Sequence, residues 1–536
     1  MQYMQREAKI KDAFKLYKYI LNNYKNTALL ESLGEFSEEV SQYSIIGVIA
    51  GEQLYEKENN YYIKSFKSNQ VISVDDWQAV IDEWIGPLGK SSNPFQTGAI
   101  GYLGYELNRC FEIVPYNEKL KSPISKICLV RYDLLYVYDR KSHQAFWISQ
   151  ECMDDEINII EKQFENSKFG SLEFYTFGET EKDFEYENYL NSISECVECI
   201  KNGDMLQANI TMRFHGQYKG SPFVLYEALR NSTPNPFFAY LDFDEKLIST
   251  SPESFISVSN GAIVSRPIKG TVRVEIDGQD QSGYLEQSRK NCSENVMIAD
   301  LIRNDIGRIS KIGTVSVPIL CGTKKFNQIY HLETVVKGQL KDNVMLSDML
   351  RATFPGGSIT GAPKVKAMEI IDRLEFAERG PYCGAIGFFG SSGFLSTSIG
   401  IRIIYFSDNK YYLHAGGGIV VGSDPQEEYD ELLLKVESLI KTLNKFNVLY
   451  ELRDKLDKIN VDLLRLISKR TDIIKEITAI KNENNIPIVQ KNRMEEILFN
   501  AYKINKDEKL NIPKSFIDNL FAVIFNESMK IEGDES

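Results

Sequence analysis

Three charged side chains near residue 430 have the type and spacing that a metal or anion site requires. Glu428 and Glu431 are three residues apart, and Lys435 follows four residues after Glu431. In a helix this spacing sets all three side chains on one face. Two such carboxylates offer the hard oxygen ligands that Mg²⁺ prefers, with retained water completing its coordination. The same spacing is also typical of an ordinary ion pair on a solvated helix face, so the motif by itself leaves both interpretations open.

A glycine-rich loop is the second feature that could bind a ligand. Residues 354–364 read Phe-Pro-Gly-Gly-Ser-Ile-Thr-Gly-Ala-Pro-Lys, a composition that excludes a helix interior. Residues 365–374 then carry apolar side chains at helical spacing, so we expect a helix to begin where the loop ends. Small residues let a ligand approach backbone N–H groups, and a helix N-terminus favours an anion. The alternative is a sharp turn before a helix that starts at a proline.

The segments around these residues are typical of a mixed α+β module. Residues 1–150 combine short alternating runs with turn clusters, which indicates antiparallel strands with interspersed helices. Residues 151–182 are acidic and form a connection, and helices and strands alternate irregularly over residues 183–446. A chain of 536 residues is too long for one ordinary core. We therefore expect at least two domains, with residues 1–150 and 183–446 in one structural unit.

The last segment, residues 448–536, has a helical pattern throughout. From Val448 to Ile480 apolar residues recur in steps of three and four with charges between them, which predicts one long amphipathic helix. We expect a second helix from near Lys491 and a third over Ser515–Met529. The pattern predicts an all-α module that follows the α+β module.

Composition restricts the class of protein. The net charge of −13 and the pI of about 5.2 argue against a nucleic-acid-binding surface. An anionic ligand therefore needs a local cluster of cations or a metal. Eight cysteines without regular spacing predict no disulfide framework. A polar N-terminus and the lack of any long apolar run predict a cytoplasmic protein without a membrane span.

The glycine-rich loop is one of eight ordered segments that resemble the chorismate-binding enzymes. This family includes the large components of anthranilate synthase and aminodeoxychorismate synthase, isochorismate synthase and salicylate synthase. The matching segments are Ser251–Phe255, Arg266–Thr271, Asp300–Arg308, His331–Leu332, Phe354–Lys364, Arg379–Gly387, Ser398–Arg402 and Ala415–Ile419. The resemblance implies an anthranilate synthase-like α+β fold, in which two large antiparallel sheets pack face to face with helices outside.

The resemblance also implies roles for individual residues. Glu294 and Glu431 are implied as Mg²⁺ ligands, with Glu428 close by. Glu253 matches the general acid that protonates the departing 4-hydroxyl of chorismate. His331 matches a position beside the substrate ring. The positions implied to contact substrate are Thr360, Tyr382, Arg402, Gly416, Gly417, Gly418 and Lys435.

Two positions separate the reactions of this family. Isochorismate and salicylate synthases use a lysine as the base that activates water, and here Gln207 stands at the matching position, where an amide cannot act as a base. Anthranilate synthases typically have alanine where this chain has Lys269, whereas aminodeoxychorismate synthases have a lysine that is thought to attack the ring. A buried lysine with a lowered pKa can supply the neutral amine for that attack. The alternative for Lys269 is an exposed lysine in a turn.

Other ligands and partners follow from the same resemblance. The sequence contains no glutamine amidotransferase segment, so we expect ammonia from a separate glutaminase subunit, in a hetero-complex, or from solution. Residues 28–32 resemble the segment that forms a tryptophan pocket in related large components, which makes Ser32 a candidate regulatory residue. The same residues are equally typical of a buried strand.

The helical module resembles the small helical chorismate mutases, which need no metal or cofactor. Arg470, Lys481 and Arg493 match the cations of that family, which hold both carboxylates and stabilise the breaking ether. Arg470 and Lys481 are eleven residues apart, or ~16 Å along a helix, and share a face. Arg453 lies seventeen residues before Arg470, roughly 25 Å away, and cannot reach the same ligand. We therefore expect a homodimer in which each site takes Arg453 from the neighbouring chain. A solvated helix face remains the alternative for any one of these cations.

Several positions of the helical module depart from the mutase pattern. Met494 stands where a glutamate binds the substrate 4-hydroxyl, and Gln490 where an aspartate is usual. Ser528 is retained. Glu532 stands where bacterial members often have glutamine, so it helps only when protonated, and mutase activity should rise on mild acidification. These departures suggest 4-amino-4-deoxychorismate as the mutase substrate and 4-amino-4-deoxyprephenate as its product.

The sequence therefore predicts a bifunctional enzyme, with three alternatives. The first alternative is a mutase that converts chorismate to prephenate, beside a synthase that serves 4-aminobenzoate and folate. The first module could be an anthranilate synthase component I, against which Lys269 argues. The helical module could also be a non-catalytic dimerisation or regulatory domain.

Overall fold

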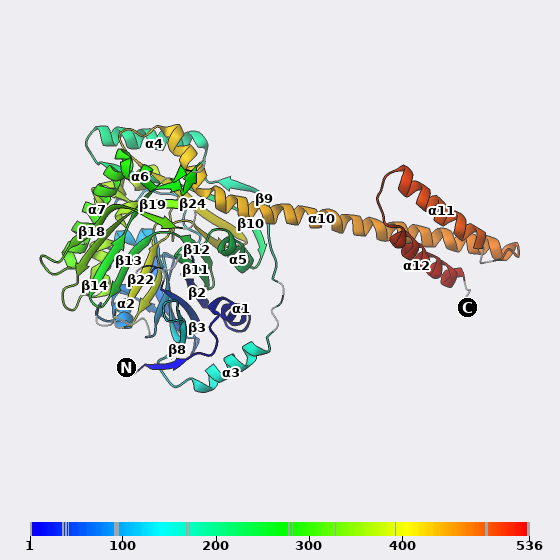
Figure 1. The fold of residues 1–536 in the computed structure, drawn as a ribbon, viewed down its shortest axis with the longest axis horizontal. Coiled ribbons are helices and arrows are strands. Elements are labelled where there is room, and N and C mark those ends of the chain that lie inside the picture. The colour runs from blue at the N-terminus through cyan, green and yellow to red at the C-terminus, as the bar shows by residue number, and fades with distance from the viewer. Residues whose placement is uncertain are drawn as a thin grey trace. The chain divides into compact units, whose positions relative to one another are not determined.

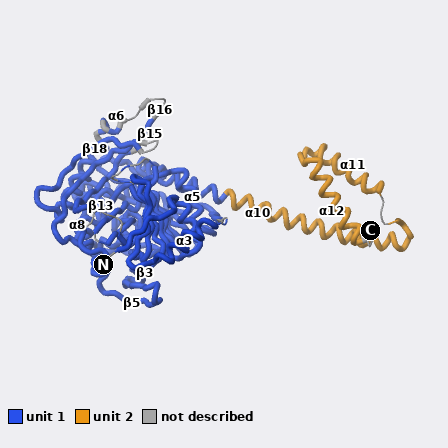
Figure 2. Tube along the Cα trace, turned by 60° about the horizontal axis from the view of Figure 1, so that its bottom comes forward, with its two compact units in different colours: residues 1–447 blue, residues 448–536 orange. Residues whose placement is uncertain are grey.

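The chain forms two compact units, residues 1–447 and residues 448–536, which are coloured separately in Figure 2. The structure, a computed structural model, describes residues 3–34, 37, 40, 42–89, 96–167, 170, 172–276, 279–280, 282–326, 329–391, 393–487 and 491–532. For a few residues within these ranges, including Glu532, only the backbone is described.

Twelve α-helices and two short 3₁₀-helices occur in the described residues. They are α1 (Ala13–Asn23), α2 (Trp77–Ile85), η1 (Tyr105–Cys110), α3 (Asp154–Glu165), α4 (Tyr186–Lys201), α5 (Pro222–Ser232), α6 (Ser282–Gln287), α7 (Arg289–Ile309), α8 (Leu346–Thr353), η2 (Gly357–Ile359), α9 (Lys364–Leu374), α10 (Pro425–Glu483), α11 (Lys491–Asp507) and α12 (Lys514–Glu532).

The strands belong to the first unit. They are β1 (Met4–Glu7), β2 (Thr27–Glu31), β3 (Tyr43–Lys57), β4 (Asn60–Ser65), β5 (Val71–Val74), β6 (Gly98–Leu103), β7 (Ile127–Asp139), β8 (Gln144–Ser149), β9 (Phe174–Lys182), β10 (Gln207–Gly220), β11 (Phe237–Asp242), β12 (Lys246–Ser251), β13 (Ser254–Ser259), β14 (Ala262–Arg266), β15 (Ile268–Arg273), β16 (Glu275–Ile276), β17 (Gln279–Asp280), β18 (Ser316–Phe326), β19 (Ile329–Gln339), β20 (Gly361–Ala362), β21 (Ala385–Gly390), β22 (Leu395–Ile399), β23 (Ile403–Ser407) and β24 (Lys410–Ile419).

The first unit is an antiparallel α+β structure, as the sequence predicted. Within the described residues, 22 strands are joined in one hydrogen-bonded network, and β16 pairs only with β17. Long bent strands join regions that would otherwise be separate sheets. Strand β3 pairs with β2 at its start and β4 at its end, and its register with β7 shifts three times between Gly47 and Glu52. Such bulges bend a strand and let it take part in two layers.

One hydrophobic core extends through this unit and contains buried residues from Ala8 to Leu443. Strand β7 is buried along most of its length because it lies between β3, β6 and β8. Helices α1, α3, α4 and α5 lie at the periphery of the strands (Figure 1). Residues 1–150 and 183–443 therefore share one core. None of the helices in the described residues combines the length and apolar character needed to span a membrane.

The glycine-rich loop leads into a helix, as predicted, because α9 begins at Lys364. Residues 352–362 are all buried, and the loop contains the 3₁₀ turn η2 and the short strand β20. Strand β20 pairs with the start of β10 at Gln207 and Ala208. The loop is therefore an interior element with a defined position in the sheet.

Helix α10 begins at Pro425, earlier than the long amphipathic helix that the sequence predicted from Val448. It runs without interruption over Pro425–Glu483, because no glycine or proline occurs between Gln426 and Glu483 to end it. The second unit contains the remainder of α10 with α11 and α12, which are the three helices that the sequence predicted.

Candidate active sites

Lys269 and Glu253 both contact Ser358, which lies in the glycine-rich loop. The amine of Lys269, on β15, donates a hydrogen bond of 3.3 Å to the carbonyl oxygen of Ser358. Glu253 is buried in the turn between β12 and β13 and accepts hydrogen bonds from the Ser358 side chain and the backbone of Ile268. The loop thus brings the predicted nucleophile and the predicted acid to one place.

Burial changes the protonation of both groups in the direction that this chemistry needs. Burial raises the pKa of Glu253 to about 7, although Ser358 and the positive charge of Lys269 oppose the shift. The carboxyl is therefore partly protonated near neutral pH and can donate a proton. Burial also lowers the pKa of the Lys269 amine, against the charges of Glu253 and Glu294. A larger fraction of this lysine is consequently neutral and nucleophilic than of a lysine in water.

His331 is held next to Lys269 by an irregularity in the sheet. The pairing of β15 with β19 shifts between Lys269 and Thr271, around Gly270, which has a φ of +62°. The Nδ1 atom of His331 lies 3.1 Å from the Gly270 carbonyl and must carry the proton, because a carbonyl only accepts. Burial, with a contribution from the Arg402 charge, lowers the pKa of His331 to about 4. His331 is therefore a neutral imidazole, and Arg402 lies close to it.

Strand β24 leaves room for side chains because three consecutive residues have no Cβ. A Cβ on Gly417 would lie 2.9 Å from a carboxylate oxygen of Glu428 and 3.7 Å from the amine of Lys435. The Lys435 amine donates to the Gly416 carbonyl at 2.9 Å. A Cβ on Gly418 would lie 2.1 Å from the amide nitrogen of Gln207. The glycines therefore let polar side chains from α10 and β10 approach the backbone directly.

The glycine segment of β24 also keeps one edge available. Strand β24 is paired along its whole length with β10. On its other edge, β23 pairs only with residues 410–413 of β24. In the described part of the chain, residues 416–418 thus have no strand partner on that second edge. Alternate N–H groups of an antiparallel strand face opposite edges. Those facing away from β10 can donate to a carboxylate ligand.

Three predicted Mg²⁺ ligands approach this region from two helices. The charges of Glu294, on α7, and Glu431, on α10, both act on the Lys269 amine. Glu428 is buried and accepts a hydrogen bond of 2.7 Å from Ser423. Among the described residues, no group of three or more acidic, histidine or cysteine side chains is arranged to hold a metal. The residues thus fit a Mg²⁺ ion that binds one or two carboxylates and otherwise water and substrate, and not a cage made by the protein alone.

Two other predicted substrate contacts have defined structural partners. The ring of Tyr382 stacks on that of His414, with 5.0 Å between ring centroids. Thr360 is fully buried, and its hydroxyl donates a hydrogen bond of 2.7 Å to the Gly356 carbonyl within its own loop. Gln207, which the sequence predicted to match the lysine position of isochorismate synthases, is buried at the start of β10.

Arg379 is a positioning residue that the sequence marked only as part of a matching segment. Its fully buried guanidinium donates to the Glu375 carboxylate at 2.7 and 3.0 Å, to the Ile359 carbonyl at 2.9 Å and to the Asn209 carbonyl at 2.6 Å. It thereby joins the glycine-rich loop to β10. Ser358 was also missed, because only the fold brings its loop to the lysine.

In the helical unit, Arg470 on α10 and Ser528 on α12 form a direct contact. The guanidinium of Arg470 donates a hydrogen bond of 2.7 Å to the Ser528 hydroxyl. Lys481 lies on the same helix, whereas Arg493 is exposed on α11 and pairs with Glu496 at 2.6 Å. The structure therefore brings together two of the predicted mutase residues.

Other predicted mutase positions do not join this pair. Arg453 lies on the same uninterrupted helix as Arg470, seventeen residues earlier, so roughly 25 Å separates them along the axis. Met494 lies on α11 and is half-buried. Gln490 and the side chain of Glu532 lie outside the part of the chain that the structure describes.

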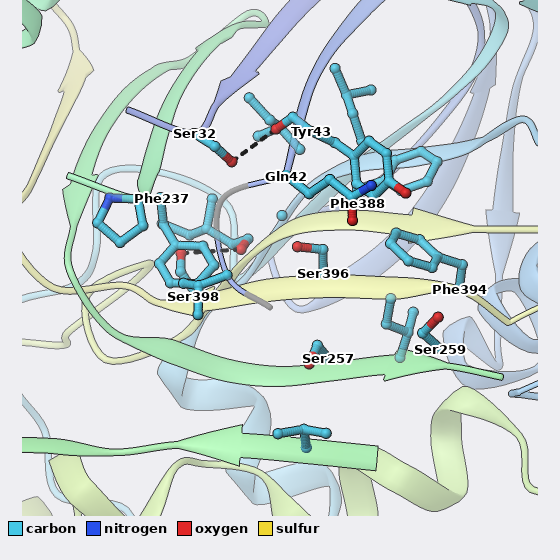
Figure 3. Close-up of a pocket in the computed structure, with 18 of the residues that line it drawn as sticks. Ser32, Gln42, Tyr43, Phe237, Ser257, Ser259, Phe388, Phe394, Ser396 and Ser398 are labelled. Atoms are coloured by element: carbon cyan, nitrogen blue, oxygen red, sulfur yellow. Dashed lines mark hydrogen bonds between the residues drawn. The ribbon is translucent and has the colours of Figure 1, made fainter. Parts of the chain in front are cut away.

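The candidate regulatory residue Ser32 lines a cavity of about 330 Å³. The Ser32 hydroxyl donates a hydrogen bond of 2.8 Å to the Tyr43 carbonyl. The guanidinium of Arg140 donates one of 2.7 Å to the Ser32 carbonyl. Figure 3 shows aromatic rings and serine hydroxyls around the same space. The labelled residues of these two kinds are Tyr43, Phe237, Phe388, Phe394, Ser32, Ser257, Ser259, Ser396 and Ser398.

The antiparallel α+β unit with its partly buried Lys269, its buried Glu253 and its glycine strand is the site that the comparisons with known proteins address. The profile of the family described as chorismate binding enzyme matches residues 45–441, and that of chorismate mutase type II matches residues 452–533. The chain belongs to the family of chorismate binding enzymes and carries a chorismate mutase type II domain at its C-terminal end.

Two kinds of named synthase component are similar to this chain. Aminodeoxychorismate synthase component 1 of Escherichia coli (strain K12) is 37% identical over 69% of this chain and 82% of its own length. Anthranilate synthase component 1 of Acetivibrio thermocellus is 31% identical over 78% of this chain and 90% of its own length. The crystal structure of anthranilate synthase component I from Streptococcus pneumoniae TIGR4 superposes with a TM-score of 0.66 at 29% identity, covering 76% of this chain and 93% of that one.

Proposed function

We propose that this chain is a bifunctional enzyme that acts first as a Mg²⁺-dependent 4-amino-4-deoxychorismate synthase. Its mutase domain then rearranges the product to 4-amino-4-deoxyprephenate. One observation carries the first assignment: the Lys269 amine lies at Ser358 beside the buried carboxyl of Glu253. A nucleophilic amine next to a proton donor is what the replacement of a ring hydroxyl by nitrogen requires.

The chemistry proceeds through a covalent intermediate. The Lys269 amine forms a bond to the chorismate ring while the bond between carbon 4 and its hydroxyl breaks. Glu253 gives its proton to the hydroxyl, which leaves as water, and takes a proton back from the attached nitrogen. Ammonia then bonds to carbon 4 as the bond to Lys269 breaks, and one proton passes from the incoming nitrogen to the lysine. The net change is the replacement of a hydroxyl by an amino group.

Positive charge and backbone donors hold the substrate in this scheme. Arg402, with Tyr382, binds the enolpyruvyl carboxylate, and the segment Gly416–Gly418 and Lys435 supply further donors. His331 stays neutral beside the ring, and because its Nδ1 carries the proton, its Nε2 can accept a hydrogen bond there without adding charge. The backbone of Thr360 completes the wall of the site.

Mg²⁺ is the cofactor of this proposal. Glu294 and Glu431 would hold it, with Glu428 nearby, and it would neutralise a carboxylate of the substrate. The ammonia for the reaction would come from a glutamine amidotransferase subunit. The relatives named component 1 support such a partner, because their names imply a second component.

The mutase reaction needs no group besides cations that stabilise the developing charge. The contact between Arg470 and Ser528 supports a site at this point of the helical unit, with Lys481 and Arg493 as further cations. In the rearrangement the ether C–O bond breaks as a C–C bond forms, and no proton is exchanged. The amino product carries the same enolpyruvyl ether as chorismate, so the same site can act on it.

A homodimer through the helical unit is part of the proposal. Large apolar side chains on α10 are exposed in the single chain, which marks an interaction surface. They include Leu452, Leu456, Ile459, Leu463, Leu466, Ile467, Ile473, Ile477 and Ile480. An antiparallel neighbour would cover them and supply its Arg453 to the site of Arg470.

The cavity at Ser32 would serve as a regulatory site for an aromatic amino acid such as tryptophan. Aromatic rings and hydroxyl groups on its walls match a ligand with an apolar ring and polar backbone groups. Binding there would alter strands β2 and β3, which belong to the same core as the candidate active site.

Incubation of the purified chain with chorismate, Mg²⁺ and ammonium near pH 8, with products resolved by mass, tests the function. The expected product is 4-amino-4-deoxyprephenate or the aromatic pyruvate that it yields. Accumulated 4-amino-4-deoxychorismate together with prephenate would indicate two parallel chorismate enzymes instead. Accumulated amino compound without prephenate would indicate an inert helical domain, and a fluorescent anthranilate would indicate the anthranilate synthase reaction.

A further inference from the structure

Two cysteine side chains meet where the first turn of α7 lies beside β18 (Figure 1). The Cys321 thiol, on β18, lies 3.7 Å from the carbonyl oxygen of Cys292, on α7, and also interacts with the Cys292 thiol. The Cys292 thiol donates a hydrogen bond of 3.8 Å to the Leu285 carbonyl. Thiols are weak donors, so these contacts hold the two sulfurs loosely. Both cysteines are free and half-buried, and a small molecule in solution can reach them.

Strand β18 has a bulge at Cys321. Between the pairs Ile319–Val335 and Gly322–Glu333, β18 has two residues and β19 has only one. Cys321 has a φ of +54°, which is uncommon for a residue other than glycine. A bulge re-aims a side chain, and such a backbone conformation persists where the surrounding structure enforces it. The bulge therefore turns the Cys321 thiol to the first turn of α7.

The same turn of α7 carries groups that lie near Lys269. The charge of Glu294, two residues after Cys292, acts on the Lys269 amine. A Cβ on Gly270 would lie 3.2 Å from the Asn291 side chain, so the turn packs directly against β15. A displacement of about 1 Å in a group that positions substrate or metal can lower a rate about 10²-fold. A covalent bond at Cys292 would therefore be felt at the candidate active site.

We propose that Cys292 and Cys321 form a reversible disulfide that slows amination by drawing Glu294 away from the metal. The oxidant is a small-molecule disulfide such as oxidised glutathione. One cysteine sulfur attacks the oxidant, which gives a mixed disulfide and releases one small thiol. The other cysteine then attacks the first, the S–S bond between them forms, and the second small thiol leaves. Two cysteines are oxidised, one disulfide is reduced to two thiols, and both cysteine protons pass to the departing sulfurs.

The bond requires a movement because its sulfurs must come to about 2 Å, closer than two thiols in contact. The bulge is held by the pairing of β18 with β19 and by a hydrogen bond of 3.0 Å from the Cys321 N–H to the Thr334 hydroxyl. The displacement therefore falls on the first turn of α7, which carries Glu294. Partial burial, with the neighbouring Cys292, raises the pKa of Cys321 to about 11, so the exchange is faster at alkaline pH.

Formation of the bond is independent of the proposed function, whereas its effect on the rate rests on that function. Reduced full-length protein is incubated with oxidised glutathione at about pH 8.5, and the remaining thiols are alkylated. Mass spectrometry of the digested protein should find the peptides of Cys292 and Cys321 joined. The initial rate of amination should fall about tenfold or more, and the Mg²⁺ concentration for half-maximal rate should rise. Dithiothreitol should reverse both changes.

Three serine variants assign the effect to the pair. Cys292→Ser and Cys321→Ser each remove one sulfur with little change of size, and both should keep their amination rate under the same oxidation. Cys152→Ser is the matched control at an exposed cysteine outside the pair, and it should lose activity as the unmodified protein does. Thermal melts of the reduced variants report whether each folds. Equal loss of activity in all three variants would mean that oxidation acts elsewhere, and would overturn the proposal.

Two results with the unmodified protein would also overturn it. One is glutathione on single cysteines without a joined pair of peptides. The other is a joined pair with an unchanged rate and an unchanged dependence on Mg²⁺. Reduced protein that fails to aminate chorismate would remove the proposed function alone. Binding of Mn²⁺ in the presence of chorismate, followed by electron paramagnetic resonance, then decides the effect on the metal site: weaker binding after oxidation supports the disulfide switch, and equal binding rejects it.

Discussion

The amine of Lys269 donates a 3.3 Å hydrogen bond to the carbonyl oxygen of Ser358, and so a strand and a loop 89 residues apart meet at one atom pair. The Ser358 side chain also hydrogen-bonds Glu253. A single residue of the glycine-rich loop therefore orients the two groups on which the proposed amination depends.

Replacement of Lys269 by alanine should abolish covalent attachment and lower the rate of amination by about 10³-fold or more, because the nucleophile is lost. Chorismate added without ammonium should give the unmodified protein an adduct on the peptide that carries Lys269, detectable by mass. Lys311→Ala, at a surface lysine that pairs with Asp342, is the control and should behave as the unmodified protein. Full amination by the Lys269→Ala variant would contradict the covalent mechanism.

The pH dependence should report the raised pKa of Glu253. Its carboxyl must be protonated to act as an acid, and burial raises its pKa to about 7. Because the acid form exists below that value, kcat/KM for chorismate should fall as the pH rises through about 7. Glu253→Gln should lower the rate about 10²- to 10⁴-fold and remove this alkaline limb. A limb that persists in the glutamine variant belongs to another group.

Gly417→Ala should weaken binding of both Mg²⁺ and chorismate. Its new Cβ would lie 2.9 Å from the Glu428 carboxylate, so this side chain must shift, and it would be in ordinary contact with the Lys435 amine at 3.7 Å. We expect the concentration of Mg²⁺ for half-maximal rate to rise about tenfold, in line with the effect of disturbing groups around a metal. Gly422→Ala is the matched control, because nothing lies within 4 Å of its added Cβ. Equal effects of the two substitutions would count against a site at β24.

Arg470→Ala should lower mutase turnover about 10²-fold or more, because a preorganised charge near the breaking ether is lost. Amination by the first unit should continue, and its product should accumulate. Arg465→Ala removes an exposed arginine of the same helix, paired only locally with Asp462 at 3.0 Å, and should have little effect. If Arg470→Ala changes no turnover, the helical unit is not an enzyme.

Mixing two inactive variants tests the shared dimer site. Arg453→Ala and Arg470→Ala should each lack mutase activity, because every site needs one residue from each chain. After exchange of subunits about half of the dimers are mixed and each has one intact site, so about a quarter of the activity should return. No recovery, despite mixed dimers detected by native mass spectrometry, would mean that each chain builds its own site.

The local features of this chain could be predicted because they depend on neighbours in sequence. Apolar spacing identified α9, α11 and α12, and the proline and glycine content identified the loop before α9. The sequence does not predict that α10 continues through residue 446, because side-chain character changes there although no helix breaker is present. Helix ends depend on breakers and caps more than on polarity.

The sequence by itself determined the order of elements, the two modules and the residue types of the candidate sites, through spacing and eight matching segments. Only the tertiary structure decided that Ser358 joins Lys269 to Glu253 and that Arg470 meets Ser528. The physical reason is that a pKa shift or a cavity depends on which distant segments exclude water from a group. Desolvation is a property of packing in three dimensions, and spacing along the chain does not encode it directly.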